Sequence, residues 1–586
     1  MEILKKYKVQ IIVFTGLLLS GLLRIQHLWL PIGADRHAFR QTETAIIIQN
    51  YFNDGWSLFH YEMPVLGQPW HILFEFPIYQ SVVYFVMRIL HKTNIDVWCR
   101  LISLCSFYLS VFVLKKIAEL LVDKKSLYCI CAIYLFAPYT ILWSRAALID
   151  YMSVLFALVY VWGLYSWLTK GKRTAVIALA AGVMAYLLKA TTMFPYVFFL
   201  GCLIITYFVK QIKEKYGKIT INAVFRYAAD NRKRIILLAL LCILPVIPGI
   251  GWTKYADMVK QQSVYTQMLT SEALHDWNYG TIEQKMQISN WTGIINRLTS
   301  YIGGKWIFLC MALAYICIGK KRNLYIVLNC ILSVFLTIFL LFNLYYVHDY
   351  YIIALTPILS IMYGTVLSVI INKRKAISVG IIALCIVFFQ IGTNERYVKL
   401  ALFPDYEMSQ TGAYIASVTR PEERIVIEGE DWNPSTLYYA NRKGLMLVNP
   451  GLATEELFSD FLQQENYTTL VTYSPEFADI WAQHYNIFIQ YPRKEEVLMY
   501  KFYQQAPILE NDEKNGVDMI KIKYEAVAEP TKVVIRLTDR NGNEFLDSII
   551  LLTNKEEIYY YAGALWENIE SVSLDIPENM KIEMEY

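Results

Sequence analysis

The chain has 586 residues, of which 56% are hydrophobic and 18% are charged, and its formal net charge at pH 7 is +4. Soluble globular proteins carry about 25% charged residues, so this composition excludes a chain that is soluble along its whole length. The apolar residues occur in runs of about 20, the length at which a helix crosses a bilayer. We therefore expect a multi-pass membrane protein, and we expect no nucleic-acid partner.

The first apolar run, 9–30, lacks a small-residue cleavage site and is interpreted as a retained signal anchor. Whether the next run, 74–90, crosses the membrane can be judged from the positions of the basic residues. Lysine and arginine concentrate on the cytoplasmic side of spanning helices. If 74–90 does not cross, all the basic clusters fall on the cytoplasmic side. These clusters are 5–8, 115–125, 170–173, 210–234, 320–322 and 373–375. We therefore predict that 74–90 is an interfacial helix on the outer surface.

The same register predicts about eleven spans in the cytoplasmic (inner) membrane. They are 9–30, 97–114, 126–146, 151–169, 174–190, 192–210, 235–252, 304–319, 323–345, 351–371 and 376–393. The outer segments are then 31–96, the turn at Asp150, 253–303, 343–351 and the polar tail.

Two domains are expected from this register. The first is a polytopic α-helical membrane domain over 1–394 that carries the active site. The second is an extracytoplasmic α/β domain over 395–586, with strand-like segments at 424–428 and 468–472. It ends in a small β unit beyond about residue 515, where 533–538 and 548–552 alternate between apolar and polar residues.

The stretch 33–50, GADRHAFRQTETAIIIQN, directly follows the first span. Six of the nine residues at 35–43 are charged or strongly polar, namely Asp35, Arg36, His37, Arg40, Gln41 and Glu43. Such a density of polar groups beside lipid is costly to keep unless the groups bind something. The following residues, 46–52, are typical of a helix that lies along the membrane and would hold these groups on a fixed surface, as acid–base chemistry requires.

Further ionisable residues fall at the same outer ends. Asp150 ends the sequence SRAALID, with Arg145 shortly before it, and Lys189 is the only charged residue of its span. His348 and Asp349 lie among four tyrosines between two spans. Carboxylates and isolated cations together suit a substrate with a hydroxyl to deprotonate and a phosphate to hold.

Each of these residues also has a structural interpretation. Lys189 would reach the outer head groups with its ammonium, and Asp150 would cap the helix that follows it. Asp35 would pair with Arg36 or Arg40 and order the loop, and the group around His348 would form an aromatic interface belt. The sequence leaves these alternatives open.

DRHAFRQTETA, followed by Asn50, resembles the first-loop pattern D-x-H-x-(W/F)-R-Q-x-x-T-A of bacterial membrane glycosyltransferases with the GT-C fold. They are relatives of the protein O-mannosyltransferases and of the lipid A aminoarabinose transferase. The resemblance extends through SRAALID at 144–150, the turn at Lys189 and HDYYIIALTP at 348–357. It also includes VIEGEDWNPSTLYYANRKGL at 426–445.

The resemblance implies a sugar carried on a polyprenyl phosphate and transferred, with inversion, to a hydroxyl acceptor at the outer face of the membrane. It implies that Asp35 is the acidic residue of the first loop, with Glu43 its rival for the role of general base. Asp150 would be the acidic residue of the second outer loop and would shape the acceptor or sugar site, which makes it a third catalytic candidate. The better-known relatives have adjacent Asp and Glu residues in the first loop, whereas these two acids are eight positions apart. Both therefore stay candidates.

The remaining roles implied by the resemblance concern binding. Lys189 and Arg40 would contact the lipid phosphate, and His348 with Tyr351 would close the pocket. The other expected substrate-binding residues are Arg36, His37, Gln41 and Arg145. Some GT-C enzymes use a divalent metal, but no residues here have ligand spacing, so no metal or other cofactor is predicted.

Two rival functions are weighed against a glycosyltransferase. A transporter or flippase for lipid-linked glycans predicts polar residues at mid-membrane, which the expected spans mostly lack. A non-catalytic anchor that presents the outer domain does not explain why charged groups gather between the spans. We therefore expect a membrane glycosyltransferase whose partners are a polyprenyl-phosphate sugar, a hydroxyl acceptor (a lipid-linked glycan, a cell-surface polymer or a protein) and membrane lipids.

Overall fold

The computed structural model describes residues 8–373 except 27, 172 and 319–322, and residues 406–585 except 449–466, 484–486, 495, 504–517 and 578–579. The chain forms two compact units. The membrane unit consists of Met1–Tyr61 and Leu73–Pro404, and the sheet unit consists of Glu62–Ile72 and Asp405–Tyr586. The boundary expected at residue 394 lies outside the described residues, and Glu62–Ile72 groups with the sheet unit although it lies far from it in the sequence.

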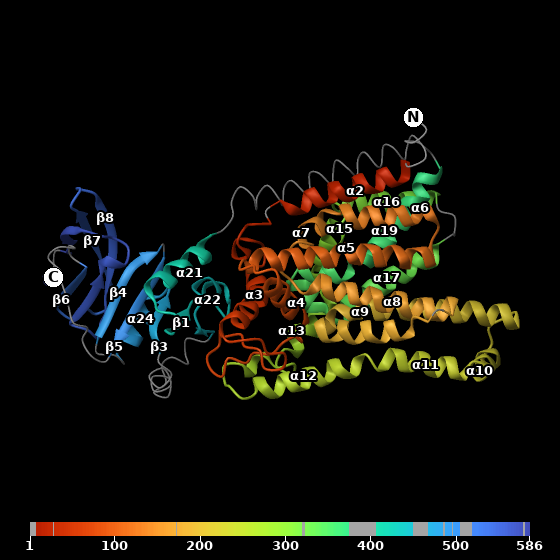
Figure 1. Cartoon of the computed structure of the whole chain (residues 1–586), viewed down its shortest axis with the longest axis horizontal. Coiled ribbons are helices and arrows are strands. Elements are labelled where there is room, and N and C mark those ends of the chain that lie inside the picture. Colours follow the sequence, from red (N-terminus) through yellow and green to blue (C-terminus); the bar gives the residue numbers. More distant parts are fainter. Residues whose placement is uncertain are drawn as a thin grey trace. The chain divides into compact units, whose positions relative to one another are not determined.

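Among its described residues, the membrane unit contains five helical stretches that are long and apolar enough to cross a bilayer. They are Ile95–Leu121 (α5), Asp150–Lys170 (α8), Ala175–Tyr216 (α9), Arg232–Lys260 (α11 and α12) and Tyr350–Ile370 (η3 and α19). A further candidate is the pair α15 (Ile288–Ser300) and α16 (Lys305–Ile318), whose axes are bent by 80°. Figure 1 shows the long helices running side by side. The protein is thus a polytopic helical membrane protein, as predicted.

Several expected spans differ from these helices in detail. The expected spans 174–190 and 192–210 both lie in α9, where Lys189 has non-helical torsions (φ −167°, ψ 97°) and two helices meet at a kink. The first span and 323–345 appear as shorter apolar helices, α2 (Lys8–Ile25) and α17 (Leu324–Leu340). The span expected at 376–393 lies outside the described residues.

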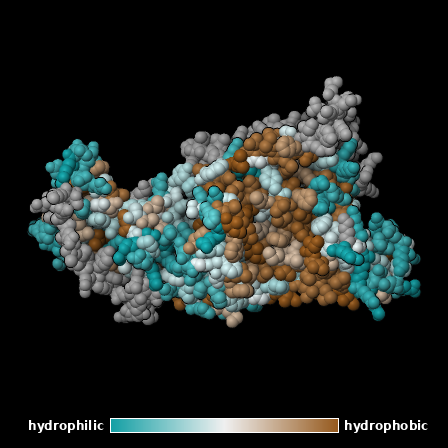
Figure 2. Space-filling view, in the orientation of Figure 1, coloured by the Kyte–Doolittle hydropathy of each residue, from teal (hydrophilic) through white to brown (hydrophobic). Residues whose placement is uncertain are grey.

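Short helices gather at one end of the bundle. They are α3 (Ala38–Asn53), α4 (Ile78–Ile89) and α13 (His275–Tyr279), and α10 (Ile221–Asp230) lies at the other end (Figure 1). The 12 residues of α4 extend about 18 Å, too short for a hydrocarbon core of about 30 Å. This length agrees with the expectation that 74–90 does not cross. Figure 2 shows a hydrophobic surface over the long helices, with hydrophilic residues toward α10.

The core of the membrane unit includes the contact of α19 (Thr356–Lys373) with α6 (Lys124–Phe136). A Cβ atom on Gly364 would lie 2.5 Å from the Cα atom of Ile130, so only glycine permits this approach. The hydroxyls of Ser126 and Ser368 are 2.7 Å apart on the same two helices. Small residues allow membrane helices to pack closely, and these two contacts hold the middle and the C-terminal part of α19 against α6.

The sheet unit has an eight-stranded sheet of order β11-β6-β9-β4-β5-β3-β1-β2 and a three-stranded sheet of order β10-β7-β8. The strands are β1 (Arg424–Glu428), β2 (Gly444–Leu447), β3 (Tyr467–Thr472), β4 (Ile487–Lys494), β5 (Val497–Tyr503), β6 (Met519–Tyr524), β7 (Thr531–Asp539), β8 (Glu544–Leu551), β9 (Glu557–Tyr561), β10 (Ile569–Asp575) and β11 (Ile582–Glu585). The helices are α21 (Glu407–Val418), α22 (Ser435–Ala440) and α24 (Pro475–Ala482). Strands β1 and β3 match the predicted segments, and β1 pairs in parallel with β2 and β3.

Two features of the sheet unit were not expected. The strands beyond residue 515 do not form one separate unit, because β6, β9 and β11 belong to the large sheet. The segment Glu62–Ile72 lies along the edge of β2, where the Gly444 amide donates to the Pro64 carbonyl (3.1 Å) and the Met446 amide donates to the Val65 carbonyl (2.7 Å). This edge of the sheet is therefore covered by a segment that lies between α3 (Ala38–Asn53) and α4 (Ile78–Ile89) in the sequence.

Candidate active site

The first loop turns into α3 at His37, whose φ of 52° is left-handed. The Asp35 carboxylate just before it is shared between two donors. Its Oδ2 atom lies 2.9 Å from Nη2 of Arg100 on α5, and its Oδ1 atom accepts from the Arg36 amide at 2.8 Å. Arg100 is fully buried and also donates to the carbonyls of Leu28 and Leu30. Asp35 therefore forms its ion pair with Arg100, and not with Arg36 or Arg40, the neighbours in sequence that were considered as its partners.

Arg36 and His37 both contact Asp349, far along the chain. Nη2 of Arg36 lies 2.7 Å from Oδ2 of Asp349, and Nε2 of His37 lies 2.8 Å from Oδ1. The backbone carbonyl of Asp349 accepts from the Tyr139 hydroxyl at 2.6 Å. The structure thus joins the first loop to the segment that follows α18 (Phe342–Val347).

Arg40 bridges two carboxylates, donating from Nη1 to Oε1 of Glu43 and from Nη2 to Oε1 of Glu75. The Glu43 side chain is 5% exposed, and its Oε2 atom has no hydrogen-bond partner among the described residues. Burial raises the pKa of Glu43 above its ordinary value, although the positive charge of Arg40 opposes the shift. Arg40 thus fixes one carboxylate oxygen of Glu43, and the other oxygen can accept a hydrogen bond or a proton from a ligand.

Asp150 and Lys189 form a buried ion pair. Nζ of Lys189 lies 2.8 Å from Oδ1 of Asp150, and their side chains are 4% and 2% exposed. The second oxygen of Asp150 has no partner in the part of the chain that the structure describes. The Lys189 ammonium also lies 5.2 Å and 4.8 Å from the ring centres of Tyr350 and Tyr351. Lys189 therefore does not reach toward head groups, and Asp150 makes no side-chain cap for α8.

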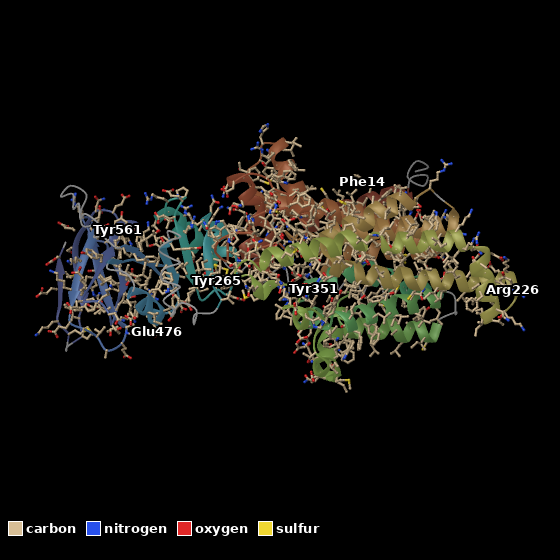
Figure 3. All side chains as sticks on the ribbon, turned by 90° about the horizontal axis from the view of Figure 1, so that it is seen from below. Phe14, Arg226, Tyr265, Tyr351, Glu476 and Tyr561 are labelled. Atoms are coloured by element: carbon tan, nitrogen blue, oxygen red, sulfur yellow. The ribbon has the colours of Figure 1, made fainter. Side chains whose placement is uncertain are left out.

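These two pairs share one electrostatic environment. The charge of Lys189 lowers the pKa of Glu43, against the dominant effect of burial. Burial, with the nearby charges of Arg40 and Lys189, lowers the pKa of His348 to about 4, so this imidazole is neutral at neutral pH. We call Arg40, Glu43, Asp150 and Lys189 the polar cluster. It unites residues that the sequence placed on different loops, and Figure 3 shows the adjacent Tyr351 far from Arg226 on α10.

Two other predicted site residues, Gln41 and Arg145, bind backbone groups of the segments that surround the polar cluster. Gln41 accepts from the Ala147 amide and donates to the Arg36 carbonyl, both at 2.8 Å. Arg145 donates from Nη1 to the Gln26 carbonyl at 3.0 Å. Both side chains are fully buried. Gln41 thus ties the first loop to the turn before α8, and Arg145 ties that turn to the residue that follows α2. Their predicted contact with substrate stays a prediction.

Glu75 and Arg100 belong to the site but were missed from the sequence. A signal existed for Glu75, since it is the only charged residue between Met63 and Met87. Arg100 lies early in an expected span that otherwise holds no charge before Lys115. Among the described residues, no group of three His, Cys, Asp or Glu side chains is arranged to hold a metal ion.

The helix bundle, with this cluster at one end and a sheet unit attached, defines the class as a polytopic membrane protein with the GT-C fold. A solved structure of similar fold is ArnT from Cupriavidus metallidurans bound to undecaprenyl phosphate, with a TM-score of 0.55 and 12% sequence identity over 83% of this chain and 97% of that chain. ArnT in the apo state gives a TM-score of 0.53 and 12% identity over 85% of this chain and 100% of that chain.

The archaeal oligosaccharyltransferase AglB from Archaeoglobus fulgidus has a TM-score of 0.47 and 10% identity over 99% of this chain and 96% of that chain, a score too low to support an argument. No protein-family model and no curated protein matches the sequence. At these levels of identity, the similarity to ArnT concerns the fold, which agrees with the predicted fold class.

Proposed function

We propose that the chain is an inverting glycosyltransferase that moves a sugar from a polyprenyl-phosphate donor to a hydroxyl acceptor at the outer face of the cytoplasmic membrane. The observation that carries this proposal is the polar cluster. It places two buried carboxylates, each with one oxygen lacking a hydrogen-bond partner, beside two cations. The fold shared with ArnT, a protein solved with undecaprenyl phosphate, supports the choice of donor.

In the proposed step, Oε2 of Glu43 takes the proton of the acceptor hydroxyl. The resulting oxygen attacks the anomeric carbon from the face opposite the phosphate, and the bond between that carbon and the phosphate oxygen breaks. The phosphate leaves with increased negative charge, which Lys189 and Arg40 stabilise. Asp150 positions Lys189 through its 2.8 Å contact. Glu43 suits the role of base because its raised pKa gives it greater proton affinity than an ordinary glutamate.

Asp35 is assigned a positioning role, since both its oxygens already accept hydrogen bonds. Replacing Asp35 by Asn is expected to destabilise the fold by up to about 3–5 kcal/mol, because Arg100 loses its buried counter-charge. The transfer rate per folded molecule should stay within about tenfold of wild type, well short of the ~10²-fold loss expected for a general base. Measuring the transfer rate of monodisperse Asp35→Asn protein checks this prediction. A loss of 10²-fold or more would indicate that Asp35, and not Glu43, is the general base.

The transporter alternative is weakened by the charged residues that the spans do contain. Arg24 on α2 donates to the Ser144 hydroxyl at 2.8 Å and to the Leu135 carbonyl at 2.8 Å. Arg100 is held by Asp35 and by carbonyls, as described above. Because each guanidinium is fully buried and bound by the protein, neither lines a hydrophilic path. The anchor alternative explains none of the polar cluster.

The proposed orientation predicts that the sheet unit lies outside the cytoplasm. Asn541, in the exposed turn between β7 and β8, and Arg226, on exposed α10, are suited to single cysteine substitutions. A membrane-impermeant maleimide applied to intact cells should label Asn541→Cys, and should label Arg226→Cys only after the membrane is opened. The unsubstituted chain controls for native thiols. The reverse pattern would overturn the orientation and the outer-face assignment.

The function itself is tested in cells that make the donor, by comparing cells that express the wild-type chain with cells that express Glu43→Gln. We expect the variant cells to accumulate one polyprenyl-phosphate sugar, detected by mass spectrometry of extracted lipids, because its consumption is blocked. The mass of the sugar would identify the donor. Equal amounts of every polyprenyl-phosphate sugar in both cultures would contradict a transferase.

A further inference from the structure

A separate cavity of about 210 Å³ lies beside the start of α3, and neither Lys189 nor Arg40 is among its lining residues. Its walls include Arg36, His37 and Asp349. Tyr139 on α7 (Pro138–Trp143) and two residues of α15, Arg297 and Ser300, complete the polar lining. The volume is below the ~300 Å³ at which pockets for drug-sized ligands begin. It therefore admits a single small head group.

The charge of this cavity is positive. The Asp349 carboxylate is divided between Arg36 and His37, at 2.7 Å and 2.8 Å. Arg297 donates to the Tyr345 carbonyl at 3.1 Å, and no carboxylate among the described residues pairs with it. Two guanidinium groups thus face one carboxylate, even with the imidazole counted as neutral. A guanidinium without a counter-charge near the bent apolar pair α15–α16 favours an anionic ligand.

The cavity wall is held in place before any ligand arrives. His37 has a left-handed φ of 52°, a conformation that is uncommon for residues with a side chain and that is found at functional sites when the surroundings enforce it. Asp349 enforces it through its contacts with His37 and Arg36, and Tyr139 fixes the Asp349 backbone. The Arg36 side chain remains 41% exposed, so it is accessible to a ligand.

We propose that this cavity is the acceptor subsite and that the acceptor carries a phosphate or phosphodiester group close to the hydroxyl that receives the sugar. This proposal rests on the proposed function. Arg297 and Arg36 would bind the phosphate oxygens with their planar donor groups, which match phosphate geometry. His37, on the wall nearest α3, would accept or donate a hydrogen bond to a hydroxyl of the same head group.

The test uses the full-length protein in maltoside micelles, which contain no phosphate, and two probes. Short-chain phosphatidic acid presents the phosphate on a lipid, and glycerol 3-phosphate presents it free in solution. We expect micromolar-range titrations to show binding that Arg297→Gln and Arg36→Gln each weaken by about tenfold. Arg297→Lys keeps the positive charge and should retain part of the affinity for the probes. Arg226→Gln, an exposed arginine at the far end of the bundle (Figure 3), is the matched control and should change nothing.

The outcomes separate this inference from the proposed function. Binding of phosphatidic acid alone would support a lipid-linked acceptor, and binding of both probes would support a phosphate-bearing polymer or soluble glycan. Wild-type affinity in both Arg297→Gln and Arg36→Gln would overturn the acceptor subsite. Binding that is lost in the double variant Lys189→Met/Asp150→Asn, but not in the arginine variants, would place the probe in the donor site. That result would overturn only the inference about the cavity.

Discussion

Replacing Glu43 by glutamine is expected to lower the rate of sugar transfer by about 10²- to 10⁴-fold, the loss that removal of a positioned general base produces. The amide keeps the shape of the side chain and its contact with Arg40 but accepts no proton. Donor binding should be unchanged, because Glu43 touches the acceptor and not the phosphate in the proposed step. The rate of single-turnover transfer, measured with saturating donor on purified protein, checks the prediction.

The pH dependence of the same reaction gives an independent test. The base acts only when deprotonated, and burial raises the Glu43 pKa above its ordinary value. The wild-type rate should therefore fall as the pH is lowered through that raised pKa, at a higher pH than the ~4.3 of an ordinary glutamate. The pKa of His348 is lowered to about 4, so the titration of His348 does not account for a fall in rate at a higher pH. A residual Glu43→Gln activity with an unchanged acid limb would contradict the assignment.

The second large effect is expected at the Asp150–Lys189 pair. Lys189→Met removes a cation from the proposed phosphate site and leaves a carboxylate buried without its partner. The free energy of unfolding should fall by about 3–5 kcal/mol, because a buried charge without its counter-charge is costly. The double variant Lys189→Met/Asp150→Asn removes that charge and should recover most of the stability. An unfolding titration in denaturing detergent measures both variants.

Donor binding should respond differently from stability. The double variant should bind polyprenyl phosphate about tenfold or more weakly than wild type, since a charged hydrogen bond is lost. Asp150→Asn alone leaves Lys189 in place, so this variant should still bind polyprenyl phosphate. Equal lipid affinity in the double variant and the wild type would remove Lys189 from the phosphate site, while leaving its structural pairing intact.

The sequence predicted the fold class because its signals were strong and local. Apolar runs, basic clusters and the dense polar stretch after the first span each depend on neighbouring residues. The kink at Lys189 was anticipated as a boundary between spans, and the short α4 agrees with the charge count that kept 74–90 out of the membrane. The alternating segments near β7 and β8 appeared as strands for the same reason.

Pairings between distant segments were not predictable in the same way. Asp35 was expected to pair with a neighbour in sequence, but helix packing brings Arg100 to it from 65 residues away. Glu75 offered a signal as a lone charge in an apolar stretch, yet nothing in one sequence indicates that Arg40 binds it. The addition of Glu62–Ile72 to the edge of β2 depends on main-chain hydrogen bonds, which leave no pattern in side chains.

The proposed donor site is best tested by native mass spectrometry of the gently extracted full-length protein, with the wild type beside the Lys189→Met/Asp150→Asn double variant. We expect a polyprenyl phosphate, with or without an attached sugar, to accompany the wild-type protein and to be absent from the variant. An attached sugar would identify the donor. The finding of only bulk phospholipids in both samples would contradict a polyprenyl-phosphate site at Lys189 and with it the proposed donor.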